Sequence, residues 1–204
     1  MFGLPKEVFT DLLRHYQNLG LNATLLEKDS PETIDKETAI KVVGRKFDLV
    51  MLKFAGGSVS VGGGGGFGPT ISKKVTKTHP KLRFHYVIKG MGNRSAPDLR
   101  AEMKEKKTGF ISKKLNDIEW KGGALAELLN NDADLKEIIL GTSTTSLKVE
   151  PDEKKDCVRI IHEKGIDLIV ERGGFIIKKT ETKAENFPPM QTLEIIDGIA
   201  EHVK

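Results

Sequence analysis

Residues 81–89 read KLRFHYVIK, and apolar side chains alternate with basic ones along this segment. Because successive side chains of a β-strand point to opposite faces, a period of two predicts a half-buried strand. The face expected to be buried consists of Leu82, Phe84, Tyr86 and Ile88. The face expected to point outward is largely cationic and consists of Lys81, Arg83, His85, Val87 and Lys89.

The composition changes sharply on either side of residue 73. Residues 54–72 contain no charged side chain and hold 8 of the 21 glycines. Residues 73–114, the basic segment, carry 13 Lys and Arg against 3 acidic residues, a net charge of +10. Residues 1–72 sum to 0 and residues 115–204 to −6, which gives the formal charge of +4. This asymmetry indicates a directed electrostatic surface.

The basic segment supplies a set of candidate anion-binding residues. Ordinary solvated surface charge is one interpretation of it. The others are contact with a polyanion, either nucleic acid or an anionic lipid surface, and contact with an acidic protein. Phe84 and Tyr86 are expected to point inward, so the outward face offers few aromatic rings for base stacking. The candidates are Lys73, Lys74, Lys81, Arg83, His85 and Lys89.

The Gly-rich loop (54–72) is the second candidate site. Gly63, Gly65 and Gly68 match the dinucleotide-binding spacing, but Pro69 and the residues after it favour extended chain where that motif needs a helix. Two interpretations of the loop stay open: its backbone amides form a phosphate-binding nest, or it is a simple connector between two strands. The loop centres on Gly62, Gly63, Gly64, Gly65 and Gly66.

Helices are expected at both ends and near the middle of the chain. Apolar positions follow the helical period over 4–19, and Gly20 suits the position after the last turn. Two more helices are expected over 124–129 and 133–140, and a final one after Pro189. Further helices or strands follow from similar patterns: a short helix over 97–107, and strands over 23–27, 40–43, 47–54, 146–150, 157–162, 166–171 and 175–179.

These elements predict an α+β fold with mixed or antiparallel sheets covered by terminal and central helices. Residues 40–50 resemble residues 158–169, which raises the hypothesis of two similar helix-plus-hairpin halves. The expected organisation is an N-terminal α+β region, 1–114, and a C-terminal one, 115–204, with a single compact unit as the alternative.

Metal binding and catalysis find little support in the sequence. The five histidines are scattered without ligand spacing, so no metal and no cofactor is expected. Asp48 and Asp167 have apolar neighbours, yet the strand period sends both carboxylates outward. The single cysteine, Cys157, is expected to be a buried structural thiol. Isolated cysteine fits a cytoplasmic location, and no segment is apolar enough to predict a membrane span.

The leading functional prediction is therefore a non-catalytic binding or scaffolding protein that contacts an anionic partner through the basic segment. One alternative is an enzyme or binding protein for a phosphorylated small molecule held at the Gly-rich loop. Another is a peripheral membrane module, in which Phe67 inserts among lipid headgroups. The sequence does not indicate an oligomeric state.

Overall fold

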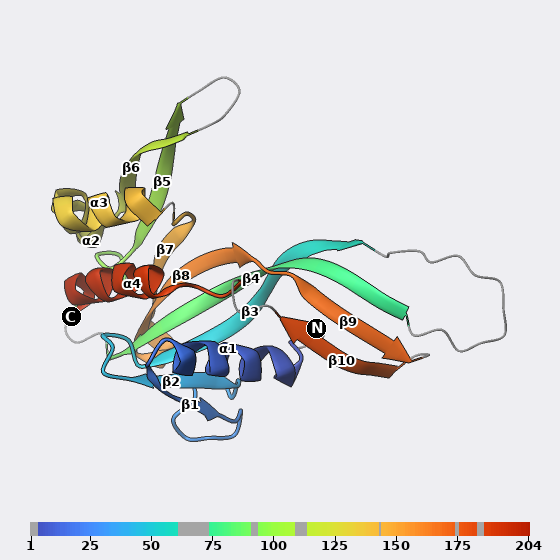
Figure 1. The fold of residues 1–204 in the computed structure, drawn as a ribbon. Coiled ribbons are helices and arrows are strands. Elements are labelled where there is room, and N and C mark those ends of the chain that lie inside the picture. The colour runs from blue at the N-terminus through green and yellow to red at the C-terminus, as the bar shows by residue number, and fades with distance from the viewer. Residues whose placement is uncertain are drawn as a thin grey trace.

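The computed structural model describes residues 4–60, 74–90, 94–108, 114–142, 144–173, 176–182 and 186–204. Within them, one antiparallel sheet runs in the order β1-β2-β3-β4-β8-β7-β5-β6, and β9 joins it between β4 and β10 (Figure 1). The strands are β1 (Asn22–Leu26), β2 (Ala39–Val43), β3 (Leu49–Ser60), β4 (Lys74–Lys89), β5 (Ala101–Thr108), β6 (Lys114–Gly122), β7 (Leu147–Asp152), β8 (Cys157–Gly165), β9 (Leu168–Gly173) and β10 (Ile176–Thr182).

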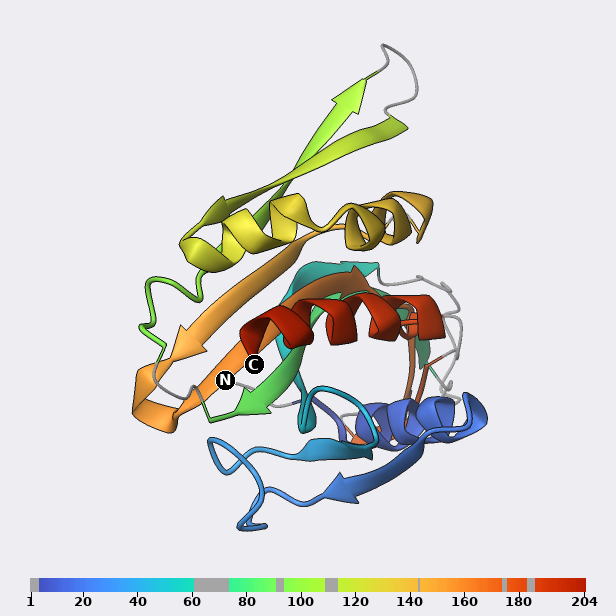
Figure 2. The same ribbon diagram turned by 90° about the vertical axis from the view of Figure 1, so that its left-hand side faces the viewer.

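One face of the sheet is covered by helices. Figure 2 shows α4 crossing over the middle of the sheet and α2 and α3 alongside the β5–β6 hairpin, while α1 contacts β1, β2 and β10. Alternate residues of β4, including Phe84 and Tyr86, are fully buried beneath these helices. The helices are α1 (Lys6–Asn18), α2 (Ala124–Asn131), α3 (Ala133–Thr142) and α4 (Met190–Val203), with a 3-10 turn η1 (Glu153–Lys155).

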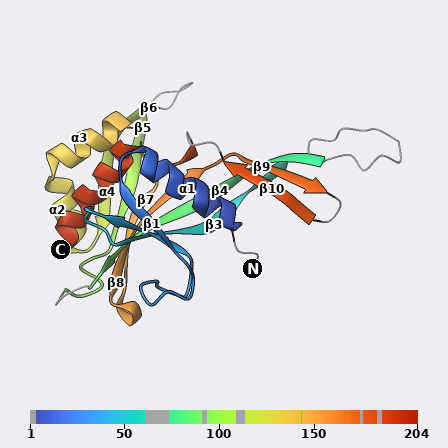
Figure 3. The ribbon, with the colours of Figure 1, turned by 60° about the horizontal axis from the view of Figure 1, so that its bottom comes forward.

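The long strand β4 has two successive partners on one edge. Lys81–Lys89 pairs with β8, and Lys74–Thr78 pairs with β9. Pro80 lies at the change of partner, where its missing N–H costs no ladder bond, and its carbonyl accepts a hydrogen bond from the Ile166 amide at 2.9 Å. Beyond this point the outer parts of β3 and β4 form, with β9 and β10, an arm that projects from the body (Figures 1 and 3).

On the opposite face of the sheet, the described residues place no α-helix, and we call it the open face. At one end it is covered by the covering segment, residues 27–38, which connects β1 to β2. Ile34 of that segment packs against a second, smaller cluster of buried residues on the open face. This cluster consists of Ala39, Leu49, Met51, Val87 and Cys157.

Most of the predicted elements are confirmed. The four longer helices and the strand at 81–89 are present, and the strands expected over 146–150, 157–162, 166–171 and 175–179 correspond to β7–β10, in which β7 pairs with β8 and β9 with β10. Gly20 has a left-handed φ of 80° after α1, as expected for that position. Asp132 caps α3 by accepting the Leu135 amide at 2.9 Å. The α+β class with an antiparallel sheet is thereby confirmed.

The short helix predicted over 97–107 is wrong, and the strand β6 was not foreseen. Residues 101–108 form β5, in which Ala101 and Met103 point to the core while Glu102 and Lys104 point to the open face. Glu102 and Lys106 have the i,i+4 spacing of a helical ion pair, but strand pairing with β6 outweighs so weak a contribution.

The hypothesis of two similar halves is not confirmed. β2 and β3 form a hairpin, but β8 and β9 do not pair with each other; both pair with β4. Strands on both sides of residue 114 belong to one sheet, since β5 pairs with β6 and β4 with β8. Among the described helices, none is long and apolar enough to cross a bilayer.

Candidate functional site on the open face

The predicted anion-binding residues divide into those the structure describes and those it does not. Gly62 to Gly66 and Lys73 lie outside the described residues. Lys74 lies in β4, in the arm, where the structure describes the backbone pairing only. The structure describes the side chains of the remaining four, Lys81, Arg83, His85 and Lys89.

Three of these four are exposed cations, and two of the three are engaged within the protein. The Arg83 guanidinium donates to Glu163 at 2.5 Å, across the β4–β8 pair. Lys89 Nζ donates to the Glu32 carbonyl at 2.8 Å and so ties β4 to the covering segment. Among the described residues, no ion-pair partner is found for Lys81, which stands exposed at the base of the arm.

His85 has a different character from its neighbours on the strand. It is only 7% exposed, and neither ring nitrogen has a hydrogen-bond partner among the described residues. Burial, reinforced by the positive charges of Lys53, Arg159 and Arg83, lowers the pKa of His85 to about 3. The imidazole is therefore neutral at physiological pH and adds no charge to the cationic face that the sequence predicted.

A groove of about 480 Å³ lies on the open face beside His85. Its lining comes from four strands: Arg83 and His85 of β4; Ile161 and Glu163 of β8; Leu147, Lys148 and Glu150 of β7, with Ser146 before it; and Glu102, Met103, Lys104 and Glu105 of β5. A volume of this size lies within the range of small-molecule sites. The structure thus brings two of the predicted candidates, Arg83 and His85, into one concave site.

The charges around the groove are paired with one another. Besides Arg83 with Glu163, Lys104 contacts Glu102 at 2.6 Å and Lys148 contacts Glu150 at 2.5 Å. The hydrogen bond from Lys104 lowers the pKa of Glu102. Because each of these cations faces a carboxylate from the same site, the groove has no excess of positive charge to attract an anion.

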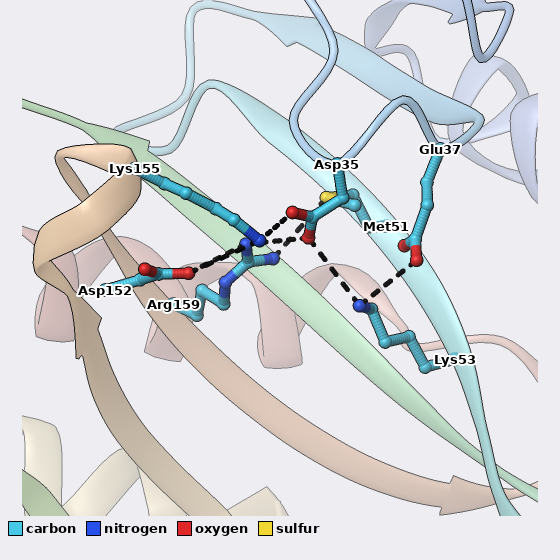
Figure 4. Close-up of polar contacts among 7 residues, drawn as sticks. All are labelled: Asp35, Glu37, Met51, Lys53, Asp152, Lys155 and Arg159. Atoms are coloured by element: carbon cyan, nitrogen blue, oxygen red, sulfur yellow. Dashed lines mark hydrogen bonds and ion pairs between the residues drawn. The ribbon is translucent and has the colours of Figure 1, made fainter.

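A second polar cluster fastens the covering segment at the other end of the open face (Figure 4). Arg159 of β8 is 7% exposed, and its Nη2 lies 3.1 Å from Asp35 and 3.4 Å from Asp152. Lys155 also contacts Asp35, and Lys53 reaches Asp35 at 3.7 Å and Glu37 at 3.3 Å. Three cations meet three carboxylates, so this cluster is electrically balanced and serves to hold the segment down.

Sequence reasoning missed the groove and the polar cluster beneath the covering segment, because each is built from residues that are distant in the chain. In the cluster, Arg159 and Asp35 are 124 positions apart, and no local pattern marks either. Sequence reasoning correctly predicted Cys157 to be a buried thiol, and burial raises its pKa. Asp48 and Asp167 are exposed as predicted; Asp48 accepts the Lys89 amide at 2.8 Å, and Asp167 pairs with His79 at 2.6 Å.

In the part of the chain that the structure describes, no group of three or more His, Cys, Asp or Glu side chains is placed to hold a metal ion. Comparison with known proteins adds no family: no family model, no curated protein and no solved structure matches this chain.

Proposed function

We propose that the protein is a non-catalytic binding protein and that the groove on the open face is its binding site. The observation that carries this proposal is the position of His85, a buried side chain that lines the groove and has two unpartnered ring nitrogens. Buried polar groups in proteins are almost always hydrogen-bonded, and both nitrogens of His85 are themselves buried, so a ligand would partner them only once the ring turns toward the groove.

The chemistry of the lining favours binding over catalysis. A general acid or base works best with a pKa near the operating pH. The pKa of His85 is about 3, and the ion pair with Lys104 keeps Glu102 ionised. Neither group is poised to exchange a proton at neutral pH.

A plug variant tests the site directly. Lys148→Trp places a large side chain at the groove wall on an exposed strand position, and Lys148→Gln is the matched control that removes only the charge. A fragment and metabolite library is screened by thermal unfolding, since a ligand that binds the folded state raises its apparent stability. We expect ligands that stabilise the parent and the Gln control but not the Trp variant. Ligands that stabilise all three equally would show that they bind outside the groove.

Contact with an anionic partner through the basic segment is the second candidate function. The exposed Lys81 favours it, because this lysine has no ion-pair partner among the described residues and shares β4 with Lys74 and Lys77 of the arm. Arg83 and Lys89 contribute less, because their charges already face Glu163 and Glu32 of the protein itself.

A salt titration tests this second candidate. The triple variant Lys74→Gln, Lys77→Gln, Lys81→Gln is compared with Arg83→Gln for binding to mixed single-stranded nucleic acid and to anionic vesicles. We expect the triple variant to flatten the log–log salt dependence by about 0.7 to 0.9 for each phosphate that it no longer neutralises, and Arg83→Gln to change it little. If the parent binds neither probe at low salt, the basic segment is a solvated surface. Stabilisation by a phosphorylated metabolite that survives Lys148→Trp would instead favour the Gly-rich loop.

A further inference from the structure

Three ion pairs on the open face of the sheet line the groove. They join Arg83 to Glu163, Lys104 to Glu102, and Lys148 to Glu150. Each of these six side chains is between 34% and 50% exposed, so a solute in the groove reaches all of them. Exposed ion pairs contribute little to stability, so a ligand can rearrange them at small cost.

Most of the other lining residues belong to the framework of the groove. The side chains of Met103 and Leu147 are part of the helix-side core. Glu105 accepts the Ser146 amide at 3.3 Å and so joins β5 to the residue before β7. The ring nitrogens of His85 are buried. Recognition of a ligand therefore depends on the exposed ion pairs.

The strand register places the ion pairs on two sides of an uncharged centre. Ile161 of β8 is the register partner of both His85 on β4 and Lys148 on β7, and Lys148 is in turn the partner of Glu102 on β5. Ile161 belongs to neither of the two apolar clusters, and His85 is neutral. Arg83 stands on the β4 side of this centre, and Glu102 stands on the β5 side.

Arg83 is suited to hold a carboxylate. It donates to Glu163 through Nε, and no hydrogen bond of its two terminal nitrogens is found among the described residues. A guanidinium edge binds a carboxylate through two parallel hydrogen bonds, so a ligand can bind there while Glu163 stays on Nε. A second carboxylate beside Glu163 leaves an excess of negative charge. A cationic group on the same ligand compensates it.

Glu102 is suited to hold an ammonium group. Lys104 donates to its Oε1 at 2.6 Å, and no hydrogen bond to its Oε2 is found among the described residues. The hydrogen bond from Lys104, with the charge of Lys148, lowers the pKa of Glu102 and keeps it ionised at neutral pH. A carboxylate accepts several hydrogen bonds, so Glu102 can bind a further donor. An ammonium group beside two lysines adds positive charge, which a carboxylate on the same ligand compensates.

The distance between these two residues sets the shape of the ligand. Arg83 and Glu102 stand on β4 and β5, with β8 and β7 between them. Neighbouring strands lie about 4.8 Å apart, so about 14 Å separates the two backbones. Both side chains line the same groove, so the span between their charged groups is shorter. A ligand that contacts both carries its two charges several bonds apart.

We propose that the groove binds a small zwitterion with a protonated amino group at one end and a carboxylate at the other. The carboxylate binds the terminal nitrogens of Arg83, the ammonium group binds Glu102, and the uncharged middle lies over Ile161. This inference rests on the proposed function, because it names the ligand class of the same groove. A ligand with one charge leaves like charges uncompensated at its end of the groove and binds more weakly.

The test uses the full chain and a series of ω-amino carboxylic acids of increasing chain length. Each is compared by titration calorimetry with the alkylamine and the alkyl carboxylate of the same length. We expect affinity to peak at one chain length, and the matched amine and carboxylate to bind about tenfold or more weakly, because each lacks one set of charge-assisted hydrogen bonds. An amine or a carboxylate that binds as tightly as the zwitterion overturns the inference.

Protein variants assign the two ends of the ligand. Arg83→Gln should weaken the best zwitterion about tenfold and leave alkylamine binding unchanged, whereas Glu102→Gln should weaken the zwitterion similarly and leave alkyl carboxylate binding unchanged. Lys154→Gln in η1, outside the groove, is the control and should bind like the parent. A thermal melt checks that each variant folds, and the probe series on the parent does not depend on the variants. Zwitterion binding that both variants leave unchanged overturns the inference.

The failure of this inference and that of the proposed function are distinguishable. If no ω-amino acid binds but fragments stabilise the parent and not Lys148→Trp, the groove is a binding site and zwitterion is the wrong class. If neither ω-amino acids nor fragments depend on the groove, both the inference and the proposed function fall.

Discussion

In both halves of the open face, side chains alternate between the two faces of the sheet, but the two halves differ in what lies over them. At one end, the covering segment crosses the sheet, and Ile34 packs on a cluster of fully buried residues such as Leu49 and Met51. At the other end nothing in the described chain crosses the sheet, and the strands form the floor of a groove. Alternation along a strand thus decides which residues share a face, whereas burial of that face depends on what crosses it.

The covered half depends on a buried cation, whereas the groove half depends on exposed ion pairs. Arg159 is 7% exposed and contacts two carboxylates, one of them on the covering segment. The side chains of Arg83 and Glu163 are 47% and 34% exposed. Solvent screens exposed pairs strongly, so equal charges should contribute unequally to stability in the two halves.

Removing the buried cation should have the largest effect. Arg159→Ala removes the buried guanidinium that contacts both Asp35 and Asp152, leaves the more exposed Lys155 as their common partner and opens the apolar cluster, and we expect it to lower the free energy of unfolding by about 3 kcal/mol. Urea unfolding measures the change, and Lys155→Gln is the control, with an expected loss below about 1 kcal/mol. Similar losses for both variants would contradict a special role for the buried guanidinium.

Acid should destabilise the protein through its buried histidines. The pKa of an unfolded histidine is near 6.5, whereas burial lowers the pKa of His85 to about 3 and that of His162 to about 4. Between these pH values the unfolded state binds more protons, so stability falls as the pH falls, by roughly 2 kcal/mol per histidine at pH 5.

His85→Phe separates the groove histidine from His162, which lies on the helix-covered face. We expect this variant to lose about 2 kcal/mol less than the parent between neutral pH and pH 5, measured by urea unfolding. His162→Phe should remove the other share of the acid sensitivity. A pH dependence of His85→Phe that equals that of the parent would mean that His85 titrates as an exposed residue.

Backbone conformation in the covering segment should give a smaller effect. Lys36 has a left-handed φ of 53°, which disfavours side chains other than glycine. Lys36→Gly relieves this cost but raises the entropy of the unfolded chain, and we expect a net stabilisation of at most about 1 kcal/mol. A thermal melt compares it with Lys28→Gly, in the same segment at a position without positive φ, which should not be stabilised. Equal shifts would remove the conformational explanation.

The smallest effect is expected in the groove half. Arg83→Gln breaks an exposed pair with Glu163 and should change the free energy of unfolding by less than about 1 kcal/mol. Added salt should reduce the difference between parent and variant further, because it screens the exposed pair. A loss approaching that of Arg159→Ala would remove the contrast between the two halves.

Local patterns predicted much of this fold. The period of two at 81–89 identified β4 and the direction of its side chains, and helical periodicity identified α1 and α4. Each of these signals is carried by several large apolar side chains within one element. The prediction for β5 failed because Ala101 and Met103 are its only apolar residues, and its extended conformation depends on pairing with β6.

The candidate site was predicted only in part. Alternation correctly placed Arg83 and His85 on one face of the strand, but the prediction that this whole face is exposed is wrong, because His85 and Val87 are buried. The neutrality of His85 was not foreseeable, because it arises from burial and from Lys53 and Arg159 on other strands. The contribution of β5 to the groove was likewise not foreseeable, because it depends on the pairing of β5 with β7, which the described chain shows only at Ala101 and Glu102.

The change of pairing partner along β4, from β9 to β8 at Pro80, has a consequence for the synthesis of the chain. The edge of β4 stays unpaired on the ribosome until residues 157–173 emerge, since both of its later partners lie there. Pairing between residues so far apart in sequence is slow, and an unpaired strand edge invites aggregation in the meantime. A proline and the charges of Lys81, Arg83 and Lys89 on the waiting strand oppose its pairing with other nascent chains. The basic segment would then protect the protein before it has folded, whatever it binds afterwards.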